Sequence, residues 1–350
     1  MPKIRVLVVD DSVVMRRILA KNLAADAEIE VAGFASNGRL ALEKIPHVNP
    51  DAVTLNIEMP EMDGLQTLRE IRKTYPKLPV IIVSAINPRD AGTTLDALAL
   101  GASDYVVKPM NGNRESAEKI LRDELIPKIK ALCVGRETLK PPVPTRGPPA
   151  AHERIEIVAI GISTGGPNAL TEVLSQLPTN FPVPILIVQH MPPLFTKLLA
   201  ERLSTKCRFP VREAASEEVL APGRAWLAPG DRHMELTHVT EEIRIILHQE
   251  PPQNACRPSV DVLLRSVTEI YGAGVLAVIM TGMGQDGLRG CRQVREAGGQ
   301  IIVQDEATSV VWGMPGAVAR EGLEDKILPL QAIAGEIMER VQRGRTTLSL

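Results

Sequence analysis

Short β-branched runs alternate with amphipathic stretches along most of the chain, and this alternation constrains the fold more than any other feature. In the first half the strand-like runs are IRVLVVD, IEVAGFAS, DAVTLN, PVIIVSA and DYVVKP, each followed by a stretch with helical spacing of apolar residues. Strands that alternate with helices form parallel sheets covered by helices on both faces. The first half is therefore predicted to be an α/β domain with five strands and five helices.

A proline-rich segment interrupts the alternation once. Residues 136–153 read RETLKPPVPTRGPPAAHE, with five prolines and no periodic apolar face, which is typical of a semi-rigid tether. We therefore predict a first domain at residues 1–130, a linker at 131–153 and a second domain at 154–345. A long loop within one domain is the alternative, but structureless loops of this length are uncommon in compact domains.

Composition excludes several classes of protein. Lys+Arg number 40 and Asp+Glu 42, for a net charge of −2, and only 3% of residues are aromatic, so neither a basic surface nor a base-stacking platform for nucleic acid is expected. The four cysteines form no C-x-x-C pair, no secretory leader precedes the first strand, and no apolar run reaches the roughly 18 residues of a membrane span. We predict a cytoplasmic protein that is not inserted in a membrane.

Polar side chains gather where the strands of the first half end, at the sheet edge that carries sites in open α/β folds. They are Asp10, Asp11, Asn56, Ser84 and Lys108. Carboxylates suit Mg²⁺, whereas a lysine and a hydroxyl suit phosphoryl oxygens. Each residue alone has a simpler explanation: the acids can belong to a helix N-cap at Ser12, Ser84 can be a turn hydroxyl, and Lys108 can be a solvated loop lysine.

The first half resembles the response-regulator receiver domain, a flavodoxin-like (βα)5 fold, over residues 3–125. The matching motifs are VVDDS at 8–12, IEMPEMDGL at 57–65, SA at 84–85 and GASDYVVKP at 101–109. The resemblance implies that Asp10 and Asp11 help to bind Mg²⁺ and that Ser84 and Lys108 contact the phosphoryl group. It also implies an aromatic switch at Tyr105 and a cis peptide bond between Lys108 and Pro109.

Asn56 departs from the receiver pattern. The residue before I-E-M-P is the phosphate-accepting aspartate of that family, and here it is Asn56. An amide can ligate Mg²⁺ through its oxygen, but it has no carboxylate to attack a phosphoryl donor. The phosphorylation switch is therefore not expected to operate, and the histidine kinase CheA would act as donor only with the acceptor restored.

The alternation restarts after the linker with IEIVAIG, VPILIVQH, GVLAVIMTG and QIIVQDE, which predicts a second, doubly wound parallel sheet with a β-hairpin insertion at about 211–250. The turn GISTGGP at 161–167 fits G-x-S-x-G and places Ser163 at a strand-to-helix turn, a geometry that suits a nucleophile. Two alternatives remain: Ser163 caps the helix, or the turn is a degenerate dinucleotide-binding loop. The second is weakened because Gln189-His190 stands where a ribose-binding acid is expected.

A nucleophilic serine needs a base, an orienting acid and an oxyanion hole. His190 ends the strand next to that of Ser163, and Asp286 follows GVLAVIMTG at the same sheet edge. Asp286 could also cap the helix that begins near Leu288. The backbone N–H groups of Thr164 and Met283 could form the oxyanion hole. His233 in LAPGDRH is a further candidate for substrate binding.

With these residues placed, the second half resembles the catalytic domain of the chemotaxis receptor methylesterase family, CheB, over about 154–345. The supporting runs are GISTGGP, VQHMP, LAPG, RPSVD, TGMGQDG and QDEATSVVWGMPGAV. The resemblance implies a Ser163–His190–Asp286 triad that needs no cofactor and hydrolyses γ-glutamyl methyl esters, with deamidation of glutamines, on chemoreceptors. It makes Arg257 and the loop of Trp312 candidates for substrate recognition, although either can be purely structural.

Two functions follow from these patterns. The first is a methylesterase and glutaminase of chemotaxis adaptation that its receiver restrains and regulates. The second is a regulatory binding module that docks partners without phosphate and carries a vestigial esterase fold. The complete triad favours the enzyme, whereas Asn56 favours the binding module.

Overall fold

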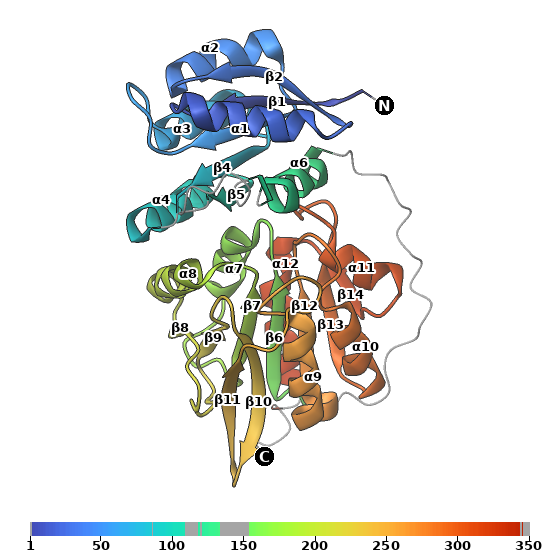
Figure 1. The fold of residues 1–350 in the computed structure, drawn as a ribbon. Helices are drawn as coiled ribbons and strands as arrows, with labels where there is room; N and C mark the ends of the chain where they lie inside the picture. Colours follow the sequence, from blue (N-terminus) through green and yellow to red (C-terminus); the bar gives the residue numbers. More distant parts are fainter. Residues whose placement is uncertain are drawn as a thin grey trace. The chain divides into compact units, whose positions relative to one another are not determined.

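The computed structural model describes residues 2–85, 87–108, 118–119, 121–133, 154–343 and 345. The chain divides into two compact units, Met1–Thr138 and Leu139–Leu350, each an α/β sheet between helices (Figure 1). Pro109 and residues 134–153, which include most of the predicted linker, lie outside the described residues. Among the helices that are described, none combines the length and apolar character needed to cross a membrane.

The first unit is a five-stranded parallel sheet in the order β2-β1-β3-β4-β5, which confirms the predicted flavodoxin-like arrangement. Its strands are β1 (Ile4–Val9), β2 (Ile29–Ala35), β3 (Ala52–Asn56), β4 (Val80–Ser84) and β5 (Asp104–Val107). Its helices are α1 (Val13–Ala24), α2 (Gly38–Val48), α3 (Gly64–Thr74), α4 (Pro88–Ala99) and, after a π-helical turn at Leu121–Leu125, α6 (Ile126–Cys133). Leucines of α1 and isoleucines of α6 pack with valines of β1 in a core with almost no exposed surface.

The second unit is a seven-stranded parallel sheet in the order β14-β13-β12-β6-β7-β9-β8. Its strands are β6 (Ile157–Ile162), β7 (Ile185–Gln189), β8 (Val211–Glu213), β9 (Ala225–Leu227), β12 (Val275–Ile279), β13 (Gln300–Gln304) and β14 (Lys326–Leu328). Its helices are α7 (Gly166–Leu174), α8 (Pro193–Lys206), α9 (Val260–Tyr271), α10 (Leu288–Glu296), α11 (Met314–Arg320) and α12 (Leu330–Arg343).

The hairpin insertion is shorter than the sequence suggested. Only β10 (His233–Val239) and β11 (Glu242–His248) form an antiparallel hairpin, and it packs on α9 through buried Met234 and Ile245. The strands β8 and β9 instead extend the parallel sheet at its edge. Strands of three residues carry too little periodicity for the sequence to reveal their partners, so tertiary pairing decides where they belong.

The order of strands in the second unit places a topological switch at β6. The chain leaves β6 for β7 on one side and later returns to β12 on the other side (Figure 1). Ligands of doubly wound sheets bind outside the carboxyl ends of the strands at such a switch. The site is therefore expected where β6, β7 and β12 end.

Candidate active site

Ser163 follows β6 directly, at the turn into α7. Its N–H donates to the carbonyl of Thr281 at 3.0 Å, and its own carbonyl accepts from the N–H of Gly166 at 2.8 Å. Gly165 has a φ of 79°, in the left-handed region that favours glycine. It is also the N-cap of α7, without a side-chain cap, so the alternative that Ser163 caps this helix is wrong. The Ser163 hydroxyl has no hydrogen-bond partner among the described residues.

His190 lies beside Ser163 because of strand register. Ile162 of β6 pairs with Gln189 of β7, so the next residues along the two strands are Ser163 and His190. Adjacent parallel strands lie about 4.8 Å apart. The amide of Gln189 donates to the carbonyl of Ser163 at 2.9 Å, and the N–H of His190 donates to the carbonyl of Ile162 at 3.3 Å. These contacts hold the two turns together at the topological switch.

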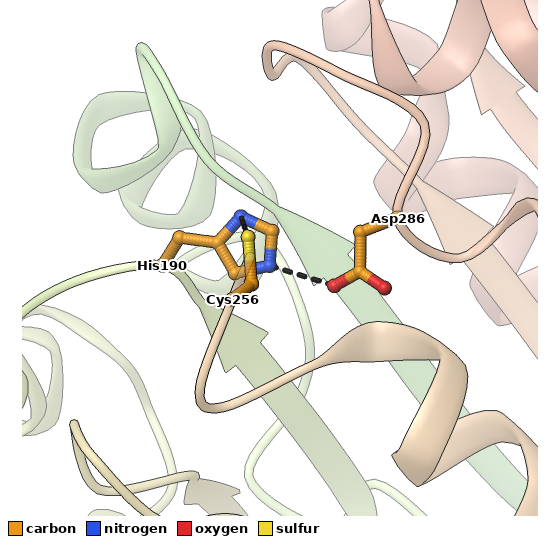
Figure 2. Close-up of side chains that lie close together, drawn as sticks. All are labelled: His190, Cys256 and Asp286. Atoms are coloured by element: carbon orange, nitrogen blue, oxygen red, sulfur yellow. Dashed lines mark hydrogen bonds and ion pairs between the residues drawn. The ribbon is translucent and has the colours of Figure 1, made fainter. Parts of the chain in front are cut away.

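Asp286 supplies the carboxylate that orients His190. Its Oδ2 lies 2.8 Å from Nε2 of the imidazole, and only 2% of the aspartate is exposed (Figure 2). The alternative role of Asp286 as the cap of α10 is wrong, because the N-cap of that helix is Gly287, without a side-chain cap. The carboxylate instead accepts from the start of α9, from the Ser259 hydroxyl at 2.7 Å and the Val260 N–H at 2.7 Å. The positive end of a second helix therefore stabilises its charge.

The pair is tuned toward its charged form. Burial works to lower the pKa of His190, but hydrogen bonds with Asp286 and Cys256 outweigh this effect and raise the pKa to about 10. Burial works to raise the pKa of Asp286, but the hydrogen bond and charge of His190, with the donors of Ser259 and Val260, lower the pKa to about 2. A histidine that takes up a proton here forms a cation that the carboxylate stabilises.

The turn after β12 passes close against Ser163. A Cβ at Gly282 would lie 2.8 Å from Cβ of Ser163, so only glycine allows this approach. Within the part of the chain that the structure describes, the N–H of Met283 has no acceptor, and the carbonyl of Thr164 accepts from the Thr281 hydroxyl at 2.9 Å. The two residues predicted for an oxyanion hole thus lie on turns that are fastened to one another through Thr281.

The three residues predicted to bind substrate make structural contacts. His233 has no exposed surface, and its Nδ1 accepts from the N–H of Ser259 at 3.2 Å, so it supports Ser259 from the interior rather than facing solvent. Arg257 donates to Asp231 at 2.9 Å and to two backbone carbonyls at 3.1 Å. Trp312 donates from Nε1 to the carbonyl of Gln304 at 2.9 Å, and it pairs with Gly282 through the backbone.

Cys256 is a neighbour of the site that sequence reasoning missed. Its Sγ lies 3.7 Å from Nδ1 of His190 and within 4.8 Å of a carboxylate oxygen of Asp286 (Figure 2). The residue stands directly before the RPSVD run, and no spacing pattern marks a lone thiol there. Only the proximity of that run to the predicted site could have drawn attention to it.

The polar residues of the first unit also converge. Lys108 Nζ contacts Asp10 Oδ2 at 2.8 Å and Asn56 Oδ1 at 3.0 Å, and Ser84 lines the same pocket, of about 230 Å³. Ser12 caps α1 as expected, and the Asp10 carboxylate accepts from its N–H at 2.8 Å. Lys108 is 18% exposed, so the alternative of a solvated loop lysine is wrong.

The Asn56 amide limits what this pocket can hold. The Nδ2 group donates to Asp11 Oδ1 at 3.0 Å and to the carbonyl of Glu58 at 2.8 Å. The oxygens of Asp10, Asp11 and Glu58 form the hard donor set that suits Mg²⁺. They fit the ion chemically, but Mg²⁺ has to compete with the amide for two of them.

Tyr105, the predicted switch residue, is buried on β5. The Lys128 Nζ lies 5.1 Å from the centre of its ring, and it also donates to the Tyr105 carbonyl at 2.6 Å. Burial raises the pKa of the Tyr105 hydroxyl well above its ordinary value. In this structure the ring is therefore an uncharged part of the core beside a cation.

Comparisons with known proteins agree with both halves. Residues 158–337 match the CheB methylesterase family, and residues 6–120 match the response regulator receiver domain. The second unit is similar to a crystal structure of the CheB methylesterase catalytic domain of Thermotoga maritima, with 43% identity and a TM-score of 0.52. That similarity covers 53% of this chain and 99% of the other.

Full-length relatives extend the match to nearly the whole chain. A protein-glutamate methylesterase/protein-glutamine glutaminase of Trichodesmium erythraeum is 52% identical over 351 residues, which cover 97% of this chain and 100% of the relative. A protein of the same name from a Nocardioides species is 48% identical over 99% of this chain and 98% of the relative. These relatives match both units over nearly the whole chain. The chain therefore belongs to the CheB methylesterase family, and its first unit is a response-regulator receiver domain.

Proposed function

We propose that this chain hydrolyses methyl esters of glutamate side chains, and deamidates glutamines, by a serine mechanism. The observation that supports this most directly is the His190–Asp286 pair at 2.8 Å, because its two members follow β7 and β12, the strands on either side of the strand that precedes Ser163. An oriented histidine beside a serine at a strand-to-helix turn suits acyl transfer. The names of the relatives point to the same reaction.

The proposed mechanism uses both nitrogens of His190. Because Nε2 is engaged by Asp286, the base is Nδ1 of the neutral imidazole, which forms when His190 loses a proton to solvent; this nitrogen takes the proton of the Ser163 hydroxyl as Oγ attacks the ester carbonyl. The N–H groups of Met283 and Thr164 stabilise the oxyanion. Collapse of the intermediate breaks the bond to the methoxy oxygen, which leaves as methanol with the proton from His190. Water then hydrolyses the acyl-serine, with His190 again as base.

We assign the substrate to γ-glutamyl methyl esters on chemoreceptors, and the role to chemotaxis adaptation in the cytoplasm. The receiver would regulate and restrain the esterase. When Mg²⁺ is bound it would neutralise charge in the receiver pocket, with Asp10 and Asp11 as ligands and Asn56 either competing or supplying its oxygen. Asn56 offers no carboxylate for CheA to phosphorylate, so the esterase should keep its resting rate whatever the phosphoryl donor.

The test is release of methanol from receptor membranes that carry methylated receptors. Ser163→Ala should abolish release, and Ser175→Ala, at the end of the same helix, should not. The losses of methanol release caused by Ser163→Ala and His190→Gln should not add in the double variant, because the triad acts as a unit. Turnover by Ser163→Ala at the wild-type rate would remove the serine mechanism. A wild-type chain that never releases methanol would instead favour the regulatory binding module.

A further inference from the structure

A buried amide stands directly before the histidine of the site, and packing does not explain it. Gln189 is the last residue of β7 and is 2% exposed. Its Oε1 is buried and accepts no hydrogen bond from any described residue. A buried polar atom without a partner costs free energy, so an apolar side chain would serve the core better at this position.

The other end of the same amide is well used. Its Nε2 donates to the carbonyl of Ser163 at 2.9 Å and makes a longer contact with the carbonyl of His190 at 3.4 Å. Both partners are acceptors, so the NH₂ group has to face them. The opposite orientation of the amide would place Oε1 against two carbonyl oxygens. The unpaired atom of Gln189 is therefore its oxygen.

A glycine makes room for this amide. A Cβ at Gly166, the first residue of α7, would lie 1.8 Å from Oε1 of Gln189. Glycine within a helix is less favourable than alanine, because it loses more conformational freedom on folding. The glycine and the unpaired oxygen both work against stability, and together they allow the amide to reach the Ser163 carbonyl.

That carbonyl is held by two donors. It accepts from the Gln189 amide at 2.9 Å and from the N–H of Gly166 at 2.8 Å. The C=O and the N–H of one trans peptide unit are rigidly coplanar and point in opposite directions. Holding the carbonyl of Ser163 therefore fixes the direction of the Thr164 N–H, which the proposed mechanism directs at the oxyanion.

The second oxyanion donor of the proposed mechanism is held in the same way. The N–H of Met283 belongs to the peptide unit whose carbonyl is that of Gly282. This carbonyl accepts from the N–H groups of Gly313 at 3.0 Å and Met314 at 2.8 Å. Of the four groups that hold the two peptide units, three are backbone N–H groups, and Gln189 supplies the one side chain.

We propose that Gln189 is a positioning residue, whose amide holds the Ser163–Thr164 peptide unit so that the Thr164 N–H meets the oxyanion. This inference rests on the proposed serine mechanism. Donors that are already aimed stabilise the developing charge without reorganisation at the moment of reaction. Misplacement of a reacting geometry by about 1 Å can lower the rate about 100-fold. The unpaired Oε1 is the structural consequence of placing Nε2 at the Ser163 carbonyl.

The test compares two identical substitutions in the full-length chain. Gln189→Met keeps the length of the side chain and removes the amide. The control is Gln300→Met, at a buried glutamine that begins β13, at the opposite edge of the sheet, and accepts from Arg340 at 3.0 Å. For each variant kcat and KM of methanol release are measured, together with the free energy of unfolding in urea.

The two variants should behave in opposite ways. Gln189→Met should lower kcat at least about tenfold and leave KM within about twofold, because an interaction of the transition state is lost. Its free energy of unfolding should not fall, because the unpaired Oε1 is removed and the Ser163 carbonyl keeps the hydrogen bond from Gly166. Gln300→Met should lower the free energy of unfolding and leave kcat unchanged, because it deprives buried Arg340 of a partner.

A second readout needs no receptor. With an alkyl fluorophosphonate, Oγ of Ser163 bonds to phosphorus, fluoride leaves, and His190 takes the hydroxyl proton while the phosphoryl oxygen occupies the oxyanion hole. The rate of this labelling, followed by mass, should fall in Gln189→Met by about the same factor as kcat. The pKa of His190, from a nitrogen-15 NMR titration, should stay within about one unit of its wild-type value.

Several results would overturn the positioning role. They are wild-type kcat and labelling rate in Gln189→Met, a loss of kcat together with a loss of folding stability, and a pKa of His190 that moves by more than about one unit. A wild-type chain that is labelled at Ser163 but releases no methanol would refute the substrate alone, and the labelling rates would then decide the role of Gln189. A wild-type chain with neither reaction would refute the serine mechanism and this inference with it.

Discussion

Removing the charge of Asp286 should change the pKa of His190 more than any other single substitution. At an effective dielectric constant of about 20, unit charges separated by the observed 2.8 Å attract by about 6 kcal/mol, equal to about four pKa units. Burial of the ring opposes this attraction, and the balance raises the pKa from 6.5 to about 10. In Asp286→Asn burial dominates, so we expect the pKa of His190 to fall by about three units or more.

The measurement is a nitrogen-15 NMR titration of the histidines in the full-length chain, with the signals of His190 assigned by their loss in His190→Gln. The matched control is Glu321→Gln, which removes a carboxylate of the second unit that pairs with exposed Arg292. It should leave the titration of His190 unchanged. If His190 in Asp286→Asn titrates within about one unit of its wild-type pKa, the carboxylate is not what sets the charge of the imidazole.

The same substitution should lower the rate. Loss of the orienting carboxylate from a Ser-His-Asp triad lowers kcat by about 10⁴-fold, or about 5.5 kcal/mol of transition-state stabilisation. We expect methanol release by Asp286→Asn to fall by that order, with the acid limb of kcat/KM moved to lower pH. A reduced rate with an unmoved limb would mean that Asp286 acts on structure rather than on the charge of His190.

Three further predictions concern stability and the receiver. The raised pKa of His190 adds stability to the fold that is fully present below pH 6.5 and is lost as the pH rises through about 10. The lowered pKa of Asp286 adds stability that is fully present above pH 3.8 and is lost as the pH falls through about 2. The urea-unfolding free energy of the second unit should therefore fall at both extremes in the wild type and less so in Asp286→Asn; identical pH profiles would contradict this. Gly282→Ala should lower the free energy of unfolding in urea by about 1–3 kcal/mol and lower activity, because its Cβ would lie 2.5 Å from Met314 Sδ. The control Gly335→Ala, whose Cβ meets open space, should raise the free energy of unfolding by about 0.5–1 kcal/mol. A tolerated Gly282→Ala would contradict the close approach to Ser163. Asn56→Asp should bind Mg²⁺ more tightly by calorimetry and gain the mass of one phosphoryl group with acetyl phosphate, because it removes the amide donor from Asp11 and supplies an acceptor carboxylate; an unchanged mass would show that the pocket cannot be phosphorylated at this position.

The sequence by itself determined the longer strands and helices and the sheet edge at which the candidate triad lies. Strands and helices have periods of 2 and 3.6 residues that a local pattern reveals, and parallel strands end at one edge of their sheet. The pattern therefore predicts Ser163, His190 and Asp286 at one edge of the sheet. The departure at Asn56 was equally visible, because it is a change of residue type within a recognisable motif.

Only the tertiary structure decided which groups these residues touch. The Asp286 carboxylate accepts a hydrogen bond from the first residue of α9 and does not cap α10. It can do so because α9 packs against α10, the helix that follows Asp286 in the chain. His233 is buried at the start of β10, where its ring accepts from the N–H of Ser259. Cys256 reaches His190 through a turn with two positive φ angles, although 66 residues separate them in the sequence. Contacts of this kind depend on where distant loops pack, and no local periodicity encodes that.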